Sequence, residues 1–564
     1  MSLTSVVNTV QQFFQPNHPP SRSYNVSHLG GAVVASVPAN PPPKPEALDL
    51  TGVNIVVPLA MLVNTTPTSS RSIHTLFELQ RSRVDAAVQT LKNLGENGDP
   101  VLEQLSHQLK GSQFKEDREA TKAELNQAKH LNKDLLNLIA SKLRQVGLSP
   151  KVAMQQAQIA FKDASREMLN DKNWNKVDTN FKHNGTSYAC TQVPAAQMKL
   201  GDKDIFPTTY NGHGICSSST CEVTHAANLW TSEIRAPDGA GGSEQVLFKG
   251  VRHGILSPYG LEKGSTERLE GARNRASEVV TAALFARDDL LTKALRGEEV
   301  SLKLVSTSLV TGGLWKERDM LDDQMGAWQE LGRTKPLVLS LMGGDGKLQE
   351  VKINLDVAAF NFGVNELALK FGLGHAQSDG YNATALGQLL GADLKAAAKP
   401  GGWVGEYLAQ TPKPENAARV EALSRQLKEI WADKAHHRDG GEPYKAAERV
   451  AMLACEIGAV PCWNCKSGKD RTGMLGAELY KAVVKSHQNS ELSAPGSQLT
   501  VGDQQLLQQA LLHGGNMEVQ AYNTGAPGNK VMTLLPAMNL SYDKRVGNDS
   551  IWSQVQGLSG LVKS

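Results

Sequence analysis

The sequence has little excess charge of either sign, few cysteines and no long uncharged apolar run. Its 564 residues carry 59 Lys and Arg against 57 Asp and Glu, a formal net charge of only +2. A protein that binds nucleic acid by bulk charge needs a concentrated basic excess, so this balance argues against that class. A membrane-spanning helix needs about 18 consecutive apolar residues, and no run approaches that length. We therefore expect any lipid substrate to be met at a membrane surface.

Cysteine is too scarce for a disulfide scaffold, since the whole chain contains six. This usage favours a reducing compartment where the protein works. The N-terminal stretch MSLTSVVNTVQQFFQ also lacks the basic start and the unbroken apolar core of a Sec signal peptide. If the protein is exported, we expect another secretion route.

The N-terminal part of the chain changes character after its first segment. Residues 16–45 are rich in Pro, Ser, Asn and Gly and cannot bury enough apolar surface to offset the entropy of ordering. We expect a disordered leader over residues 1–50. Apolar residues then recur near the helical period at residues 72–94 and 125–143, which predicts helices with one buried face. A helical domain is accordingly expected over residues 51–180.

The rest of the chain mixes strand and helix patterns. Short β-type runs occur at residues 244–251 and 300–310, and helical patterns occur at residues 267–295 and 417–434. We expect one large mixed α/β catalytic domain over residues 181–564. The predicted fold class is therefore a multidomain α+β or α/β protein with a helical N-terminal domain.

The most informative stretch is VPCWNCKSGKDRTG at residues 460–473. Residues 460–464 are expected to form a short buried strand between two helical patterns. The loop that follows has the spacing C-x5-R, from Cys465 to Arg471, with Gly468 near its centre. Five intervening residues let the backbone wrap so that its N–H groups face one tetrahedral anion at the positive end of the next helix. This pattern predicts the phosphate-binding loop of a cysteine-dependent phosphatase.

The chemistry expected of this loop is phosphoryl transfer to a thiolate. Backbone donors favour the thiolate of Cys465, which is predicted to attack phosphorus. Arg471 is predicted to bind two phosphate oxygens and to stabilise the charge of the transition state. Thr472 is expected to donate to the sulfur while the phosphocysteine is hydrolysed. The loop needs no metal and no cofactor.

The same loop concentrates positive charge. Lys466, Lys469 and the arginine against Asp470 give 3 − 1 = +2 within seven residues. Two extra cations beside one phosphate site predict a substrate with several phosphates, an inositol head group rather than a phosphotyrosine. Asp470 is the candidate general acid for the leaving hydroxyl, with Asp433 and Asp439 as rivals in the polar segment before the preceding helix.

Three other features have weaker chemical interpretations. Cys462 and Cys465 form a C-x-x-C pair, but a redox pair belongs at a helix N-terminus and the first cysteine falls in the expected strand. His436 and His437 are interpreted as a solvated pair near a helix end, with phosphate contact as the alternative. One cluster has the residue types of a zinc site but lacks the usual helix-forming spacer, so ordinary surface and core roles are favoured for His213, Cys216, Cys221 and His225.

The segment CKSGKDRTG, at residues 465–473, resembles the signature of mammalian inositol polyphosphate 4-phosphatases. From about Leu76 to the C-terminus the chain resembles the SopB/SigD and IpgD family of type III secreted inositol phosphate phosphatases. The blocks that carry this resemblance are IFPTTYNGHGIC, RHGILSPY, DVAAFNFGVNELALKFG, GGWVGEYLAQ and NTGAPGNKVM. Agreement at several separated blocks, over roughly nine tenths of the chain, is far more specific than one motif.

The resemblance implies a phosphoinositide phosphatase that is secreted into the host cell and acts at host membranes. Members of the family remove the 4-phosphate of phosphatidylinositol 4,5-bisphosphate, act on inositol polyphosphates and are implicated in phosphotransfer. The resemblance also implies that Cys465 is the nucleophile and that Arg471 is a phosphate ligand. The expected substrate-binding residues are Lys466, Ser467, Gly468 and Lys469 in the loop, with Lys530 in the GNKVM block.

The resemblance also implies partners for the N-terminal region. The helical domain is expected to bind a host Rho-family GTPase, and the leader is expected to carry a secretion signal and to bind a type III secretion chaperone. The alternative function is therefore an interaction protein that sequesters this GTPase, with the phosphatase loop in a secondary role.

Overall fold

The computed structural model describes most of the chain after the first 68 residues. The described residues are 69–95, 102–103, 106–107, 117–238, 244–312, 315–364, 372, 374–533 and 542–562. The chain divides into two compact units, one with residues 1–68 and 72–168 and one with residues 69–71 and 169–564. The division lies earlier than the expected boundary at residue 180. The expected leader at residues 1–50 lies outside the described residues.

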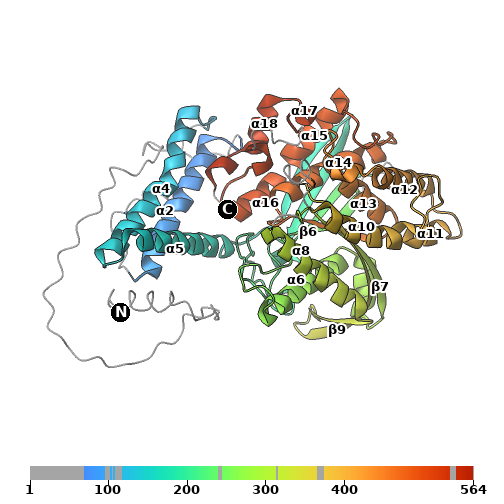
Figure 1. Cartoon of the computed structure of the whole chain (residues 1–564), viewed down its shortest axis with the longest axis horizontal. Helices are drawn as coiled ribbons and strands as arrows, with labels where there is room; N and C mark the ends of the chain where they lie inside the picture. The colour runs from blue at the N-terminus through green and yellow to red at the C-terminus, as the bar shows by residue number, and fades with distance from the viewer. Residues whose placement is uncertain are drawn as a thin grey trace. The chain divides into compact units, whose positions relative to one another are not determined.

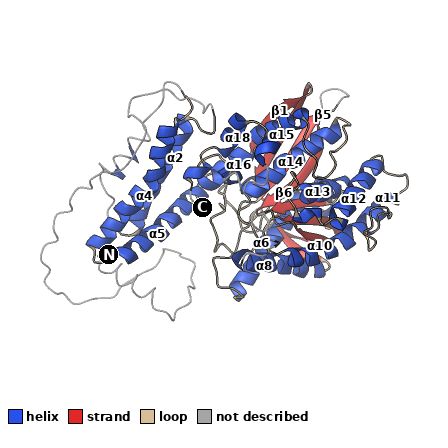
Figure 2. Cartoon of the chain, turned by 45° about the horizontal axis from the view of Figure 1, so that its top comes forward, coloured by secondary structure: helices blue, strands red, loops and turns tan. Residues whose placement is uncertain are grey.

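The described part of the first unit is helical. Its long helices are α2 (Ile73–Asn93), α4 (Lys122–Gln145) and α5 (Pro150–Asn170) (Figure 2). The side chain of Thr121 and that of Glu124 cap the start of α4 reciprocally, which satisfies two backbone donors at the helix end. Apolar side chains of the three helices share one buried cluster that includes Phe77, Val84, Leu131, Leu135, Ile139 and Phe161.

A mixed sheet of eight strands forms the centre of the second unit, in the order β1-β2-β5-β6-β10-β7-β9-β8. This sheet confirms the mixed α/β class. The strands are β1 (Val177–His183), β2 (Thr186–Pro194), β5 (Trp230–Pro237), β6 (Glu244–His253), β7 (Val300–Ser308), β8 (Leu337–Met342), β9 (Leu348–Asn361) and β10 (Val460–Asn464). The four strands β6, β10, β7 and β9 run parallel, so their carboxyl ends meet at one edge of the sheet.

The strand expected at residues 460–464 is β10, and all five of its residues are buried. Its side chains alternate between two cores, with Trp463 in one and Val460 and Cys462 in the other. Pro461 has no N–H to donate, yet it lies inside the sheet. Strand β6 pairs with β10 only from Cys462 onward, so Pro461 has just β7 as a paired neighbour.

Helices cover both faces of the sheet (Figure 1). The core on one face takes side chains from α6 (Thr266–Phe285), α7 (Asp288–Leu295) and α8 (Trp315–Arg333). The other core is built by α10 (His375–Leu390), α12 (Ala417–Ala432), α13 (Lys445–Glu456), α14 (Asp470–His487) and α15 (Val501–His513), with α11 (Gly402–Leu408), α17 (Tyr542–Val546) and α18 (Asp549–Gln556) beside them. Helix α16 (Asn516–Thr524) contacts α14 and α15. Among the described helices, none has the length and apolarity needed to cross a bilayer.

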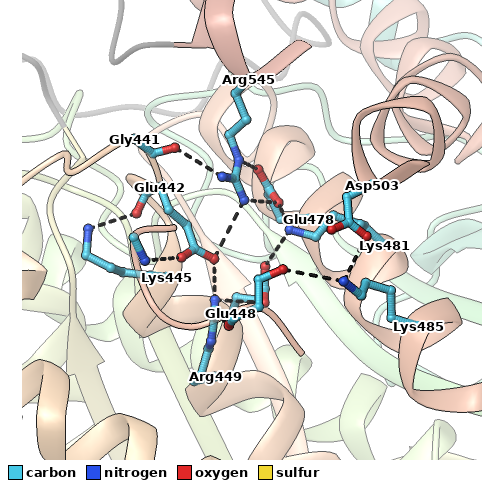
Figure 3. A network of polar contacts seen from close by, with 12 residues as sticks. Gly441, Glu442, Lys445, Glu448, Arg449, Glu478, Lys481, Lys485, Asp503 and Arg545 are labelled. Atoms are coloured by element: carbon cyan, nitrogen blue, oxygen red, sulfur yellow. Dashed lines mark hydrogen bonds and ion pairs between the residues drawn. The ribbon is translucent and has the colours of Figure 1, made fainter. Parts of the chain in front are cut away.

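A network of buried charges joins α14 to α13, α17 and the turn before α13 (Figure 3). The Arg545 guanidinium lies 2.9 Å from Glu478 Oε2 and donates to the Gly441 carbonyl at 3.0 Å. The Lys481 ammonium lies 3.5 Å from Glu448, whose Oε1 accepts from Arg449 at 2.9 Å. Burial disfavours the charged carboxylate, but Arg545 and Lys481 outweigh it and lower the pKa of Glu478. The network fastens helix α17 to α14.

Arg545→Ala is expected to destabilise the protein strongly, because it leaves the buried Glu478 carboxylate without its main partner. Removing one member of a buried ion pair typically costs about 3–5 kcal/mol of unfolding free energy. The matched control is Arg296→Ala, since the Arg296 and Glu298 side chains of that ion pair are 62% and 51% exposed and such pairs contribute about 1 kcal/mol or less. Thermal melting measures both, and equal shifts for the two variants would refute the role of the network.

Candidate active site

The loop between β10 and α14 begins at Cys465 and enters the helix at Asp470. Gly468 makes its turn with φ +65°, a conformation that side chains disfavour. A Cβ atom at this position would lie 2.5 Å from the carbonyl oxygen of His253, the last residue of β6. Only glycine therefore fits where the loop passes the end of the neighbouring strand.

The surrounding protein holds the loop by its carbonyl groups. Three of them accept hydrogen bonds: Lys466 from the Ile255 N–H at 3.1 Å, Ser467 from the Asn228 side chain at 3.1 Å and Gly468 from the Arg252 guanidinium at 3.3 Å. In a trans peptide the carbonyl and the following N–H point in opposite directions. The N–H groups of Ser467 and Lys469 therefore face the other way, toward the concave side of the loop, where an anion would bind, while the N–H of Gly468 donates to the Cys465 carbonyl at 3.3 Å.

The thiol of Cys465 differs from the other thiols of this segment. Burial opposes ionisation of Cys465, but the charge of Arg471 and the hydroxyl of Thr472 outweigh it and lower its pKa. The backbone N–H of Cys465 donates to the Thr472 Oγ1 at 2.8 Å. Burial raises the pKa of Cys455 to about 11 and that of Cys462 to about 12. Cys465 is the activated thiol of this segment, and the inert Cys462 argues against a redox pair.

Arg471 is oriented by two groups that sequence patterns did not identify. Its guanidinium donates to the Leu309 carbonyl at 2.8 Å and lies 3.3 Å from Glu317 Oε1 in the first turn of α8. Glu317 Oε2 accepts from the Thr311 N–H at 2.9 Å, which fixes the carboxylate in turn. Burial opposes the charge, but Glu317 and the thiol of Cys465 raise the pKa of Arg471. Arg471 is therefore a permanent cation beside the thiol.

The end of the NTGAPGNKVM block lies against the first turn of α14. The Asp470 carboxylate accepts a hydrogen bond from the Lys530 N–H at 2.8 Å, and the Asp470 carbonyl accepts one from the Asn529 side chain at 3.0 Å. The structure thus brings Lys530 and the loop together. Asp470 also holds this segment in place through both hydrogen bonds.

The two lysines of the loop have different environments. The Lys466 ammonium lies 4.8 Å from the centre of the Tyr259 ring, a distance suited to a cation–π contact. Lys469 is buried at the start of α14, where the helix dipole favours an anion. Both residues belong to the segment that joins β10 to α14, and their contact with substrate phosphates stays a prediction.

The rival carboxylates belong to the segment between α12 and α13. Asp433 is exposed at the C-terminal end of α12, and Asp439 lies in the turn before α13, where its carbonyl accepts from Lys445 at 2.7 Å. The Asp470 carboxylate is close enough to Cys465 to act on the pKa of that thiol. Asp470 remains the predicted acid.

Of the two interpretations that involve histidine residues, the ordinary surface and core roles favoured for the cluster at residues 213–225 agree with the structure, whereas the solvated pair His436 and His437 is wrong. His213, Cys216, Cys221 and His225 do not converge in the described residues. His225 instead pairs with Glu278 at 2.8 Å, so its imidazole has a partner in the protein core. His436 and His437 are buried against Asp379 rather than solvated, because α10 packs on the turn that carries them.

Sequence blocks quoted for the family resemblance gain physical roles here. Arg252 and His253, in RHGILSPY, lie under the loop. Asn523, in NTGAPGNKVM, donates to Asn228 Oδ1 at 2.7 Å and so steadies the amide that holds the Ser467 carbonyl. Glu317 lies outside these blocks, and no local signal marks it.

The fold and the site define an α/β protein with an activated cysteine and an arginine at the carboxyl end of a central parallel strand. The family described as "Enterobacterial virulence protein IpgD" matches residues 24–562. The chain belongs to this family.

Curated relatives agree with that assignment. The chain is 51% identical over 502 residues to the inositol phosphate phosphatase SopB of Salmonella typhimurium, covering 88% of each chain. It is 44% identical over 444 residues to the inositol phosphate phosphatase IpgD of Shigella flexneri, covering 77% of this chain and 80% of that one.

Solved structures share the fold at low sequence identity. One structure of a Legionella phosphoinositide phosphatase matches with a TM-score of 0.54 at 12% identity, covering 86% of this chain and 90% of that chain. Another matches with a TM-score of 0.55 at 9% identity, covering 86% and 75%. At such identities the likeness concerns the fold alone.

Arg471→Ala is expected to raise the pKa of Cys465, because the variant loses the positive charge that favours the thiolate. Iodoacetamide alkylation should reach half its maximal rate below the usual thiol pKa of about 8.5 in the parent protein, and at a higher pH in the variant. A Cys465→Ser protein identifies the signal of this thiol among the six cysteines. Superimposable profiles for the parent and Arg471→Ala would contradict the electrostatic role of Arg471.

Proposed function

We propose that the protein is a phosphoinositide and inositol phosphate phosphatase that works through a phosphocysteine intermediate. The observation that carries the proposal is a buried thiol whose pKa is lowered by Arg471. This thiol is at the start of a loop whose carbonyl groups accept hydrogen bonds from residues outside the loop. The names of the relatives, inositol phosphate phosphatases, support the substrate class. A 4-phosphatase acting on phosphatidylinositol 4,5-bisphosphate is the specific activity that we propose.

The reaction follows from the positions of these groups. The Cys465 thiolate attacks phosphorus, and the bond from phosphorus to the inositol oxygen breaks. Arg471 and the loop N–H groups stabilise the charge on the equatorial oxygens. Asp470 gives its proton to the departing oxygen. Water then gives a proton back to Asp470 and attacks phosphorus, the bond from phosphorus to the Cys465 sulfur breaks, and inorganic phosphate leaves. Thr472, whose hydroxyl lowers the pKa of Cys465, stabilises the returning thiolate.

The cations around the loop suit a substrate with more than one phosphate. Lys466 and Lys469 come from the loop, and Lys530 is held beside it by the carboxylate of Asp470. Together with the N–H groups of Ser467 and its neighbours, they would bind the phosphate under attack and an adjacent one. Where an inositol hydroxyl replaces water in the second step, the same intermediate gives phosphotransfer.

The partners and the secretion route are proposed from the family. A host Rho-family GTPase is the proposed partner of residues 51–180, which include the buried helical core around α2 and α4. Residues 1–50 are proposed to carry the type III secretion signal and to bind a chaperone, and residues 181–564 to act at the host membrane. Sequestering the GTPase is the second function that this arrangement would allow.

Cys465→Ser is expected to abolish phosphate release from short-chain phosphatidylinositol 4,5-bisphosphate, because serine provides no thiolate. A loss of at least about 10³-fold in kcat is expected when a nucleophile is removed. The matched control is Cys221→Ser, at an exposed cysteine, which should retain parental activity. Activity that survives Cys465→Ser would refute the phosphocysteine mechanism.

Asp470→Asn and Asp470→Ala separate the two roles of this carboxylate. Asparagine keeps an oxygen that accepts from the Lys530 N–H but cannot deliver a proton, whereas alanine does neither. We expect Asp470→Asn to lower kcat on an inositol polyphosphate by roughly 10²-fold or more. An aryl phosphate with a good leaving group needs little acid assistance and should be spared.

The comparison of the two substrates decides the assignment. Normal turnover of inositol polyphosphate by Asp470→Asn, beside an inactive Asp470→Ala, would show that Asp470 only anchors the Lys530 segment.

A further inference from the structure

A second cluster of chemically competent side chains lies where α10 meets the turn after α12. Asp379 comes from the second turn of α10, and His436 and His437 come from η3 (Ala435–His437). The Asp379 Oδ1 atom lies 2.9 Å from His436 Nε2 and 2.7 Å from His437 Nε2. One ligand atom from each residue lies within 4.8 Å of the others, and no other group of this kind occurs among the described residues.

Two consecutive histidines rarely converge on one atom, because neighbouring side chains in regular structure point apart. Here the backbone of Lys434 takes φ +49°, and the short η3 turn follows it. Aromatic rings then fix both imidazoles. The Trp431 ring stacks on His436 at 5.2 Å between centroids, and the His375 ring stacks on His437 at 3.8 Å. The His436 side chain is 2% exposed. The arrangement is therefore built into the fold.

The charge of the cluster selects the kind of ligand. A carboxylate between two imidazoles attracts a cation and repels a phosphate, which argues against a second phosphate site here. Two imidazole nitrogens and one carboxylate oxygen are typical ligands of Zn²⁺ and related divalent transition metals, whereas Mg²⁺ and Ca²⁺ prefer oxygen ligands throughout.

The distances also suit a metal. Tetrahedral Zn²⁺ with bonds of about 2.0–2.1 Å needs ligand atoms roughly 3.3 Å apart. The observed separations of 2.9 and 2.7 Å reach that value by small side-chain rotations. A pocket lined by Thr311, Gly312, Asn361, His375 and the two histidines adjoins the cluster.

We propose that Asp379, His436 and His437 bind a divalent transition-metal ion, for which Zn²⁺ is the best match. The ion joins α10 to the turn between α12 and α13. Both neutral imidazoles bind the ion through Nε2 in the tautomer that carries the proton on Nδ1, so each ring releases its Nε2 proton to water and takes one up at Nδ1.

The proposed metal site is connected by hydrogen bonds to the backbone segment that orients Arg471. Asn361, at the end of β9, receives a hydrogen bond at its Oδ1 from the Ser378 hydroxyl in α10 and donates to the Val310 carbonyl at 2.7 Å. The preceding residue, Leu309, accepts from Arg471 at 2.8 Å. The ion therefore stabilises the segment that orients Arg471. It takes no part in any step of phosphate transfer.

The test uses full-length protein without a histidine tag, stripped of metal and titrated with Co²⁺ and Zn²⁺. Metal content by mass spectrometry and the visible absorption of Co²⁺ measure binding. We expect one equivalent in the parent protein and binding at least about tenfold weaker in Asp379→Asn and in His437→Gln. The matched control is His513→Ala, which removes an exposed histidine of α15 and should bind as the parent does.

Cys465→Ser separates this site from the phosphatase thiol. Retention of the metal by this variant supports the proposal and does not depend on the proposed activity, because the variant has no nucleophile. Loss of the metal in Cys465→Ser would assign the binding to the thiolate and overturn the proposal. So would undiminished binding in both Asp379→Asn and His437→Gln, or no binding by the parent.

A melting experiment guards against variants that misfold. Zn²⁺ should raise the melting temperature of the parent and of His513→Ala, because an ion that binds only the folded state stabilises it. The two cluster variants should melt cooperatively with no response to Zn²⁺. An equal rise in the cluster variants would overturn the assignment of these residues.

Discussion

An ionised thiol in a buried position is costly, and the charge of Arg471 offsets that cost at Cys465. Burial without this partner raises the pKa of Cys462, three residues earlier in the chain, to about 12. Arg471 depends in turn on the Leu309 carbonyl and on Glu317 for its orientation. The reactivity of one sulfur atom therefore depends on the loop after β10, the segment after β7 and the first turn of α8.

The parallel centre of the sheet brings these segments together. Strand β10 lies between β6 and β7, so its carboxyl end meets theirs, and Gly468 can pass directly over the His253 carbonyl. The buried ion pair between Glu478 and Arg545 fastens α17 to the middle of α14, while α17 packs on α15 and α18. Helix α14 thus starts at the phosphate loop and is held along its length by side chains from several segments.

Local patterns predicted what depends on neighbours in the chain. An apolar run bounded by turns predicts β10, and the five residues between Cys465 and Arg471 predict a loop that can enclose an anion. The same reasoning failed for His436 and His437, which lie beside a helix end and were expected in solvent. Asp379, 57 and 58 positions earlier, buries them through contacts that no local pattern contains.

By itself, the sequence determined the strand, loop and helix that carry Cys465 and Arg471, because such a unit is specified by residues close together in the chain. The tertiary structure decided which distant groups complete it. Glu317 lies 154 positions from Arg471, and Asn228 lies 239 positions from the Ser467 carbonyl that it holds. Hydrogen bonds and charge interactions act through space, so these partners became identifiable only when folding placed them beside the loop.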